Sequence, residues 1–238
     1  MIGRRWPVRR RTAFAPALVA IPVRTRLVRA GDELAPLVAH AVNGIAGPDD
    51  VIAVSETAVA IAQGRSIAAE MIRPSPLAYA LSRRAGVLAT INQPESLQLV
   101  IDQAGALKVL YASLAHVAGR LVGRRGTFYR ILGEAIATID GYTGTLPPYE
   151  RTIVLGPLDP GGVAAAIAQR TGAHAAIVDV NDLGVAKILG ASSGVADDAV
   201  RDALLGNPHG NGDEQTPIVV LGWRAGGRSP LLRAEVAA

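Results

Sequence analysis

The stretch from residue 152 to residue 179 constrains the fold more than any other part of the chain. Its sequence, "TIVLGPLDPGGVAAAIAQRTGAHAAIVD", predicts a short apolar strand, a loop, an alanine-rich helix closed by Gly172 and a second apolar strand. A strand–loop–helix–strand order of this length places two strands parallel through a crossover. This stretch therefore predicts a parallel strand–helix–strand crossover.

Apolar patterns elsewhere predict the remaining elements. Strands are expected at residues 21–28, 51–55 and 217–223. Helices are expected after Asp32, which would cap the first of them, over 57–65, over 94–122 with a break at Gly105, and over 197–206. The predicted organisation is a basic N-terminal extension over 1–20, one domain over 21–223 and a C-terminal tail over 224–238.

The composition indicates an aliphatic core in a reducing compartment. Hydrophobic residues make up 50% of the 238 residues and aromatic residues only 4%, so the core must be built from Ala, Val, Leu and Ile. The chain has no cysteine, which excludes disulfides and thiolate metal sites. We expect a cytoplasmic protein.

The positive charge is concentrated at the N-terminus. Five of the 24 basic residues are arginines within residues 1–11, and the other 19 face 20 acidic residues. The rest of the chain is close to neutral, so we predict no nucleic-acid partner. The apolar part that follows the arginines is broken by Pro16 and Pro22 and is too short to span a bilayer. We predict a flexible extension and no membrane partner.

Two aspartates follow apolar runs that predict strands. Asp140 ends "AIATID" and Asp179 ends "AAIVD". Carboxylates at strand ends can cap the following turn. Alternatively, the pair can hold Mg²⁺ or Mn²⁺, which bind a few carboxylate oxygens together with substrate phosphate. The four histidines are scattered, so a histidine metal site is not predicted.

The chain contains no Walker sequence and no G-x-G-x-x-G after a strand. Phosphates would have to be held by turn amides or helix N-termini. The glycine-rich segment "LLGNPHGNGDEQTP" is a candidate for this role, and its alternative interpretation is a plain surface loop.

Five stretches, read in order, resemble the coenzyme F-420 gamma-glutamyl ligase family. They are "IPVRTRLVRAGDELAPLV", "GPDDVIAVSETAVAIAQGR", "AIATIDG", "GPLDPGGVAAAIAQRTGAHAAIVDVNDLG" and "LLGNPHGNGDEQTPIVVLG". The resemblance extends over roughly residues 21 to 222, although 66–125 is matched only loosely. The resemblance implies an α+β fold of the gamma-glutamyl ligase type, with a mixed sheet, packed helices and a parallel strand–helix–strand crossover. It also implies a homodimer.

The resemblance also implies a GTP-dependent amide ligase. In such an enzyme the carboxylate of a phosphorylated cofactor precursor (coenzyme F-420-0-like) is phosphorylated by GTP, and the amine of L-glutamate attacks the acyl phosphate. Divalent cations, Mg²⁺ or Mn²⁺, bridge the phosphates. The implied partners are a nucleotide, a small acidic metabolite and L-glutamate.

The resemblance assigns site residues by position, and it gives no side chain a catalytic role. The metal ligands would be Asp140 and Asp179. The nucleotide-binding residues would be Thr25, Arg26, Leu27, Val28, Glu56, Thr57, Gly206, Gly210, Gly212, Asp213 and Glu214.

Three positions depart from the family. Ile61 stands where the family has a lysine, Thr143 where it has an asparagine and Val180 where it has a threonine. These changes leave two alternatives open: a ligase with a different acceptor, or a non-catalytic or regulatory protein that binds a small anionic ligand. Arg26 and Arg65 are the nearest replacements in sequence for the missing lysine charge.

Overall fold

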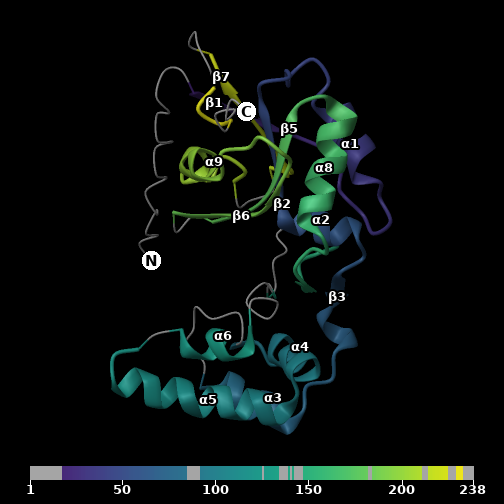
Figure 1. Cartoon of the computed structure of the whole chain (residues 1–238). Helices are drawn as coiled ribbons and strands as arrows, with labels where there is room; N and C mark the ends of the chain where they lie inside the picture. The colour runs from purple at the N-terminus through teal and green to yellow at the C-terminus, as the bar shows by residue number, and fades with distance from the viewer. Residues whose placement is uncertain are drawn as a thin grey trace, which may run out of the picture. The chain divides into compact units, whose positions relative to one another are not determined.

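A computed structural model describes residues 18–84, 92–124, 126–133, 139, 141, 147–181, 184–210, 214–224 and 229–232. The chain divides into two compact units (Figure 1). The first, here called the sheet unit, takes the described residues of Met1–Val28, Asp32–Val59 and Asp159–Ala238. The second, here called the helical unit, takes those of Arg29–Gly31 and Ala60–Leu158.

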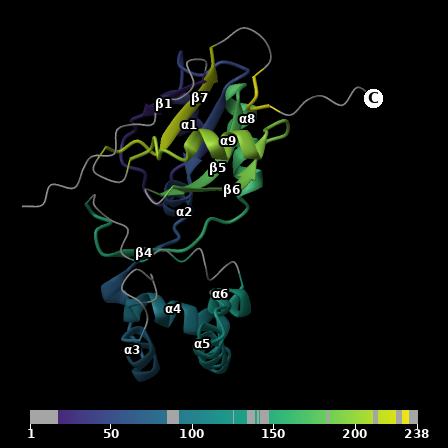
Figure 2. The ribbon, with the colours of Figure 1, turned by 90° about the vertical axis from the view of Figure 1, so that its left-hand side faces the viewer.

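The sheet unit contains a mixed five-stranded sheet in the order β1-β7-β2-β5-β6 (Figure 2). Its strands are β1 (Leu18–Val23), β7 (Ile218–Trp223), β2 (Val51–Ser55), β5 (His174–Asn181) and β6 (Val185–Ala191). β2 and β5 are parallel, whereas the other neighbouring pairs are antiparallel. The predicted α+β class with a mixed sheet is confirmed.

Helices cover both faces of this sheet. α1 (Leu34–Ala41) and α8 (Pro160–Thr171) lie on one face, and α9 (Asp197–Leu204) lies on the other (Figures 1 and 2). Because side chains alternate along a strand, Ile52 of β2 enters the core under α1 and α8, while Val51 enters the core under α9. Burial on both faces explains why "VIAV" is apolar without interruption.

The parallel pair is made by different strands from those expected. β4 (Thr152–Val154) does not pair with β5; it pairs antiparallel with β3 (Ser66–Ala68) in a separate two-stranded sheet of the helical unit. The parallel partner of β5 is β2. The helical unit is inserted in the sequence between these two strands, so the nearest upstream strand is not the spatial neighbour.

The helical unit contains a short η1 (Ala69–Met71), α3 (Pro76–Ser82), α4 (Pro94–Ala104), α5 (Ala106–Leu121) and α6 (Thr127–Leu132). Leu97, Val109 and Phe128 are buried in its core. The predicted break at Gly105 is confirmed: this residue has a φ of 84° and separates α4 from α5. None of the described helices is long and apolar enough to cross a membrane.

Two helix starts show how local chemistry sets the boundaries. Asp159 caps α8 by accepting a 3.0 Å hydrogen bond from the Gly162 N–H, and a Cβ at Gly162 would collide with that carboxylate. The expectation that Asp32 caps α1 is wrong. The N-cap residue is Glu33, which makes no side-chain cap bond, and Asp32 forms an ion pair instead.

Candidate functional site

Three strands of the sheet unit end at the same edge of the sheet. β7 is antiparallel to both β1 and β2, so β1 runs in the direction of β2, and β5 is parallel to β2. Ser55 at the end of β2 is paired with Val178, one residue before Asp179. The segments after β1 and β2, the end of β5 and the segment before β7 therefore meet here. We call this end of the sheet the carboxyl edge, the place where ligands gather in sheets with parallel strands.

Backbone hydrogen bonds join the segments at this edge. The Thr25 N–H donates to the carbonyl of Gln215 over 3.1 Å, and the Ser55 N–H donates to the carbonyl of Pro217 over 2.9 Å. The segment that leads into β7 is thereby held between the segment after β1 and the start of α2 (Glu56–Ala62). Three stretches assigned to nucleotide binding by resemblance are brought together, although they are separated by up to about 190 residues in sequence.

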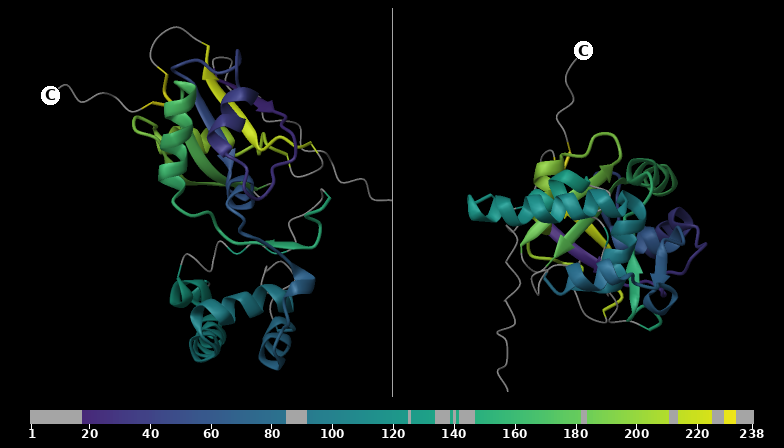
Figure 3. Two further views of the ribbon diagram at one scale, coloured as in Figure 1. Left: turned by 90° about the vertical axis from the view of Figure 1, so that its right-hand side faces the viewer. Right: turned by 90° about the horizontal axis from the view of Figure 1, so that it is seen from below.

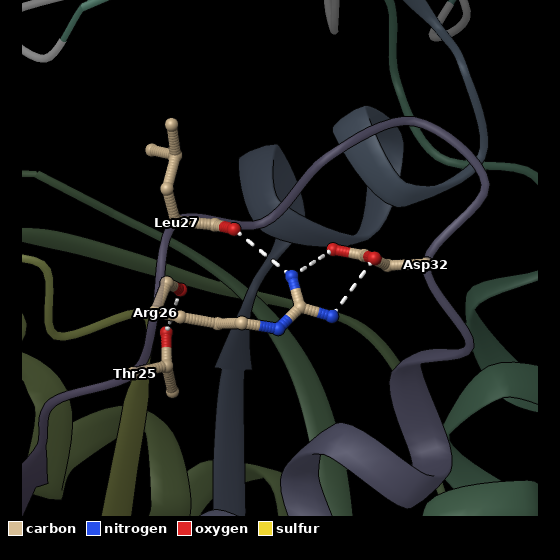
Figure 4. Close-up of polar contacts among 4 residues, drawn as sticks. All are labelled: Thr25, Arg26, Leu27 and Asp32. Carbon is tan, nitrogen blue, oxygen red and sulfur yellow. Dashed lines mark hydrogen bonds and ion pairs between the residues drawn. The ribbon is translucent and has the colours of Figure 1, made fainter.

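The segment Thr25–Val28 leaves the sheet at the end of β1, although a strand was expected over 21–28. Val28 is buried and anchors the segment, whereas Arg26 is exposed. Leu27 contributes its carbonyl, which accepts a 3.1 Å hydrogen bond from Arg26 Nη1. The Thr25 hydroxyl donates to the carbonyl of Arg26 over 2.8 Å (Figure 4). The segment is a turn fixed by its own polar groups.

Arg26 is held by Asp32 through two contacts (Figure 4). Nη1 lies 2.6 Å from Oδ2 of Asp32, and Nη2 lies 2.9 Å from Oδ1. This planar geometry is the strongest arrangement of guanidinium and carboxylate. A phosphate that binds Arg26 must compete with Asp32, so Arg26 is a weak substitute for the family lysine.

The glycine-rich segment folds back on itself. Gly206 and Gly210 lie in its described part, whereas Gly212 and Asp213 lie outside the described residues. A Cβ at Gly210 would lie 2.8–3.0 Å from the carboxylate of Glu214, so a larger residue here would displace that side chain. Gly210 also has a φ of 77°, which glycine adopts without strain.

His209 is the residue of this segment that the sequence analysis did not identify. Its Nδ1 lies 3.1 Å from the carbonyl of Thr216, while the Thr216 hydroxyl donates to the carbonyl of His209. Because a carbonyl only accepts, Nδ1 carries the proton. The buried Nε2, which has no hydrogen-bond partner among the described residues, is then an acceptor. Burial lowers the pKa of His209 to about 4, so the imidazole is neutral at physiological pH. No sequence motif marks this arrangement.

Asp179 is the metal ligand candidate that can be placed. It is half-buried on β5 opposite Lys187 of β6. Burial raises the pKa of the Asp179 carboxyl, and the nearby charge of Lys187 partly offsets this effect. A carboxylate that has lost part of its hydration suits a divalent cation, so the chemistry of Asp179 fits the implied metal.

Asp140 lies outside the described residues, as does Thr143. Within the described part of the chain, no group of three or more histidine, aspartate or glutamate side chains is close enough together to hold a metal ion. The assignment of Asp140 and Asp179 as a metal pair stays a prediction.

Two of the three positions that differ from the family, Ile61 and Val180, lie within the described residues. Both are apolar residues in apolar surroundings. Ile61 on α2 is only 7% exposed. Val180 packs against the buried cluster under α9. In the helical unit, Arg65 donates from Nε to the carbonyl of Gly156 over 2.6 Å. Because this acceptor is a neutral carbonyl, the bond does not offset the positive charge of the Arg65 guanidinium.

These features define a mixed-sheet α+β protein with polar segments at the carboxyl edge. The family model described as F420-0:Gamma-glutamyl ligase matches residues 22–123, from the end of β1 to just beyond α5. This match confirms the family resemblance seen in the sequence, and the family is one of ligases. A search of the curated proteins found no match.

Proposed function

We propose that this protein is a ligase that uses GTP and a divalent cation, Mg²⁺ or Mn²⁺, to join L-glutamate to the carboxylate of a phosphorylated cofactor precursor resembling coenzyme F-420-0. The family match supports the ligase class. The observation that carries the proposal is the meeting of the Thr25–Val28 segment, Glu56, the Glu214–Pro217 segment and Asp179 at the carboxyl edge.

The reaction would proceed in two displacements. A carboxylate oxygen of the acceptor attacks the γ-phosphorus of GTP, and GDP leaves. The amine nitrogen of L-glutamate then attacks the acyl carbon, phosphate leaves and a proton is released. Each step needs anionic groups to be held close together, so positioning and charge neutralisation are the main tasks of the protein.

The chain's own groups would divide these tasks. The Thr25–Val28 turn and the glycine-rich segment would hold the nucleotide, and Asp179 would hold the cation. When bound, the cation neutralises charge on the phosphates. Burial raises the pKa of Asp179, and the positive charge of Lys187 offsets part of that rise, so Lys187 would favour the ionised form that binds a cation.

Further properties belong to the same proposal. The protein would act in the cytoplasm as a homodimer, with a small acidic metabolite as its partner and with neither nucleic acid nor membrane. The absence of cysteine supports the reducing compartment.

The test is a reconstituted reaction. Purified protein is incubated with coenzyme F-420-0, L-glutamate, GTP and either Mg²⁺ or Mn²⁺, and mass spectrometry follows the acceptor. We expect an acceptor that has gained one glutamyl residue, with GDP and phosphate released in equal amounts. Failure to form this product with either cation, while binding of the acceptor persists, would contradict the ligase proposal.

A second candidate function is supported by Ile61. Its burial leaves the position of the family lysine without a charge, as expected for a protein that binds a small anionic ligand without catalysis. Ile61→Lys separates the two candidates, with Ile61→Met as the matched control. If position 61 contributes to nucleotide binding, the lysine tightens GTP binding, by on the order of 1–3 kcal/mol. If the lysine only lowers the melting temperature, Ile61 is a core residue and the non-catalytic candidate is favoured.

A further inference from the structure

Arg65 differs from the other basic residues that the structure describes. Among the described lysine and arginine residues, Arg65 and Arg201 are half-buried, whereas all the others are exposed. Arg201 is paired with Asp198. Arg65 forms no ion pair within the described part of the chain. A guanidinium that loses hydration without gaining a carboxylate costs stability, and an anionic ligand would offset that cost.

The backbone of Arg65 is fixed by the turn that ends α2. Gly64, with a φ of 70°, donates its N–H to the carbonyl of Ile61 over 2.9 Å, and the Arg65 N–H donates to the carbonyl of Ala60 over 2.8 Å. These two bonds form the glycine-closed turn that commonly ends helices. The turn brings Arg65 back to the last turn of α2, beside the backbone of Ile61.

A second segment holds the side chain of Arg65. β3 directly follows the turn and pairs with β4, which leads into the segment before α8 (Figure 3). The carbonyl of Arg65 accepts a 3.0 Å hydrogen bond from the Leu155 N–H, and Arg65 Nε donates to the carbonyl of Gly156 over 2.6 Å. The side-chain amide of Gln63 adds two hydrogen bonds to the backbone of Leu158, of 2.7 and 2.8 Å. The turn and this segment are therefore joined by four hydrogen bonds.

The bond from Nε leaves four of the five N–H donors of the Arg65 guanidinium available. Within the described residues, no group accepts a hydrogen bond from Nη1 or Nη2 of Arg65. Two of these N–H groups, one on each Nη, lie parallel along one edge of the planar group and match two oxygens of a carboxylate or a phosphate. Because Nε is bonded to a backbone carbonyl, the guanidinium is oriented before a ligand binds.

Arg26 carries the same group in a different state. Its two Nη atoms bind both oxygens of Asp32, over 2.6 and 2.9 Å. An anion at Arg26 has to displace this carboxylate, whereas an anion at Arg65 meets no such competitor among the described residues. Arg65 is therefore the better candidate for binding an anion.

We propose that Arg65 is an oxyanion-binding residue, whose two Nη atoms bind a phosphate group of the nucleotide or a carboxylate of L-glutamate. Both groups present two oxygens that fit the guanidinium fork, so the chemistry is the same for either source. Arg65 touches the ligand, and Gly156 and Gln63 are positioning residues for the guanidinium. The inference deepens the proposed function and rests on it only for the names of the two ligands.

The first test is calorimetry of the full-length chain with GTP and Mg²⁺ and, separately, with L-glutamate. Arg65→Gln removes the charge and the fork, so the dissociation constant of the ligand that Arg65 holds should rise at least about tenfold. A rise for GTP identifies a phosphate, and a rise for L-glutamate identifies a carboxylate. Arg65→Lys keeps the charge and loses the fork, so its dissociation constant should lie between those of Arg65→Gln and the wild type.

Arg73→Gln is the matched control. Arg73 is exposed in the same unit and forms no ion pair within the described residues, so this variant loses the same charge without losing an oriented fork. Its affinities should equal those of the wild type. Equal losses in Arg65→Gln and Arg73→Gln, or wild-type affinity of Arg65→Gln for both ligands, would overturn the inference.

The second test needs no substitution, so it also decides the case in which Arg65→Gln does not fold. Phenylglyoxal modifies arginine side chains, and mass spectrometry of peptides measures the modification at each position. On the wild-type chain, inorganic phosphate, GTP with Mg²⁺ or L-glutamate should slow the modification of Arg65 and leave that of Arg73 unchanged. Modification of Arg65 at the same rate with all three anions would overturn the inference.

This inference and the proposed function can fail separately. A chain in which Arg65 holds GTP or L-glutamate, but which forms no amide, would overturn the proposed function and leave the inference intact. If Arg65→Gln forms the amide with wild-type affinity for both substrates, the inference is overturned and the proposed function stands.

Discussion

The aspartates at the two ends of the five-stranded sheet differ in their burial and in their partners. At the end where β2 begins, Asp50 is only 4% exposed, and its carboxylate accepts a 2.9 Å hydrogen bond from the Gly47 N–H. Arg224 donates to both oxygens of this carboxylate, from Nη1 over 2.8 Å and from Nη2 over 3.2 Å. At the carboxyl edge, Asp179 is half-buried, with a raised pKa, beside polar loops. The first end uses its charges to hold the chain together. At the carboxyl edge, the partly dehydrated carboxylate of Asp179 would be stabilised by a bound cation.

At neutral pH, the largest effect on stability should come from the Asp50 end of the sheet. Arg224→Met leaves the buried Asp50 carboxylate without its ion pair, so the free energy of unfolding should fall by about 2–3 kcal/mol in urea denaturation. Arg201→Met is the matched control, because Arg201 pairs with Asp198 on the surface of α9. That loss should be within about 0.5 kcal/mol. Equal losses would remove the distinction between the two ends.

His209 should make the stability of the protein depend on pH. Its pKa in the folded state, about 4, is below the ordinary value of 6.5, so between these values only the unfolded chain binds the proton. The stabilisation is complete above pH 6.5 and is lost as the pH falls toward 4, by up to about 1.4 kcal/mol per pH unit. His209→Gln should remove this contribution, whereas His40→Gln at an exposed position of α1 should not. An unchanged pH profile in His209→Gln would contradict the buried, neutral imidazole.

Asp179→Asn should separate binding from stability. Burial raises the pKa of Asp179, so the ionised carboxylate costs stability. This cost is fully present above the folded-state pKa, declines as the pH falls from there toward the ordinary value of 3.8, and is absent below that value. At neutral pH the variant should be at least as stable as the wild type in thermal denaturation, and this advantage should shrink over the same pH interval. Cation-dependent nucleotide binding, measured by calorimetry, should be mostly lost. A variant that unfolds readily and still binds would show that Asp179 is structural.

The smallest effect is expected from the Arg26–Asp32 pair. Asp32→Ala frees the Arg26 guanidinium, so affinity for GTP should rise by a few fold, whereas Arg26→Ala should lower it. Because Arg26 is 59% exposed on its side chain, the stability of the two variants should differ little from that of the wild type. A fall in affinity for Asp32→Ala would indicate that Asp32 positions the turn for binding.

The elements with strong local signals were predictable from the sequence. The strand at 51–55, the helix break at Gly105 and the helix stop at Gly172 all lie where expected, because apolar runs and positive-φ glycines act over a few residues. The pairing of β5 was not predictable in this way. β5 pairs with β2, and the helical unit lies between these two strands in the sequence. The rule that strands consecutive in sequence pair with each other therefore fails here.

The candidate site shows the same division. The family resemblance assigned nucleotide binding to segments at 25–28, 56–57 and 206–214. The strand order brings the described residues of these segments to the carboxyl edge. Contacts of individual side chains were beyond the sequence. Asp32 had the residue type of a helix cap but pairs with Arg26, and the burial of His209 depends on a loop that closes only in the folded chain.

Hydrogen exchange of the full-length protein, with and without GTP and Mg²⁺, tests the central claim most directly. If the carboxyl edge is the nucleotide site, exchange should slow at residues 25–28, 55–57 and 214–217 while the Gly47–Asp50 turn at the other end of the sheet is unaffected. Protection at the Asp50 end alone, or no protection anywhere at saturating nucleotide, would contradict the assignment of the carboxyl edge.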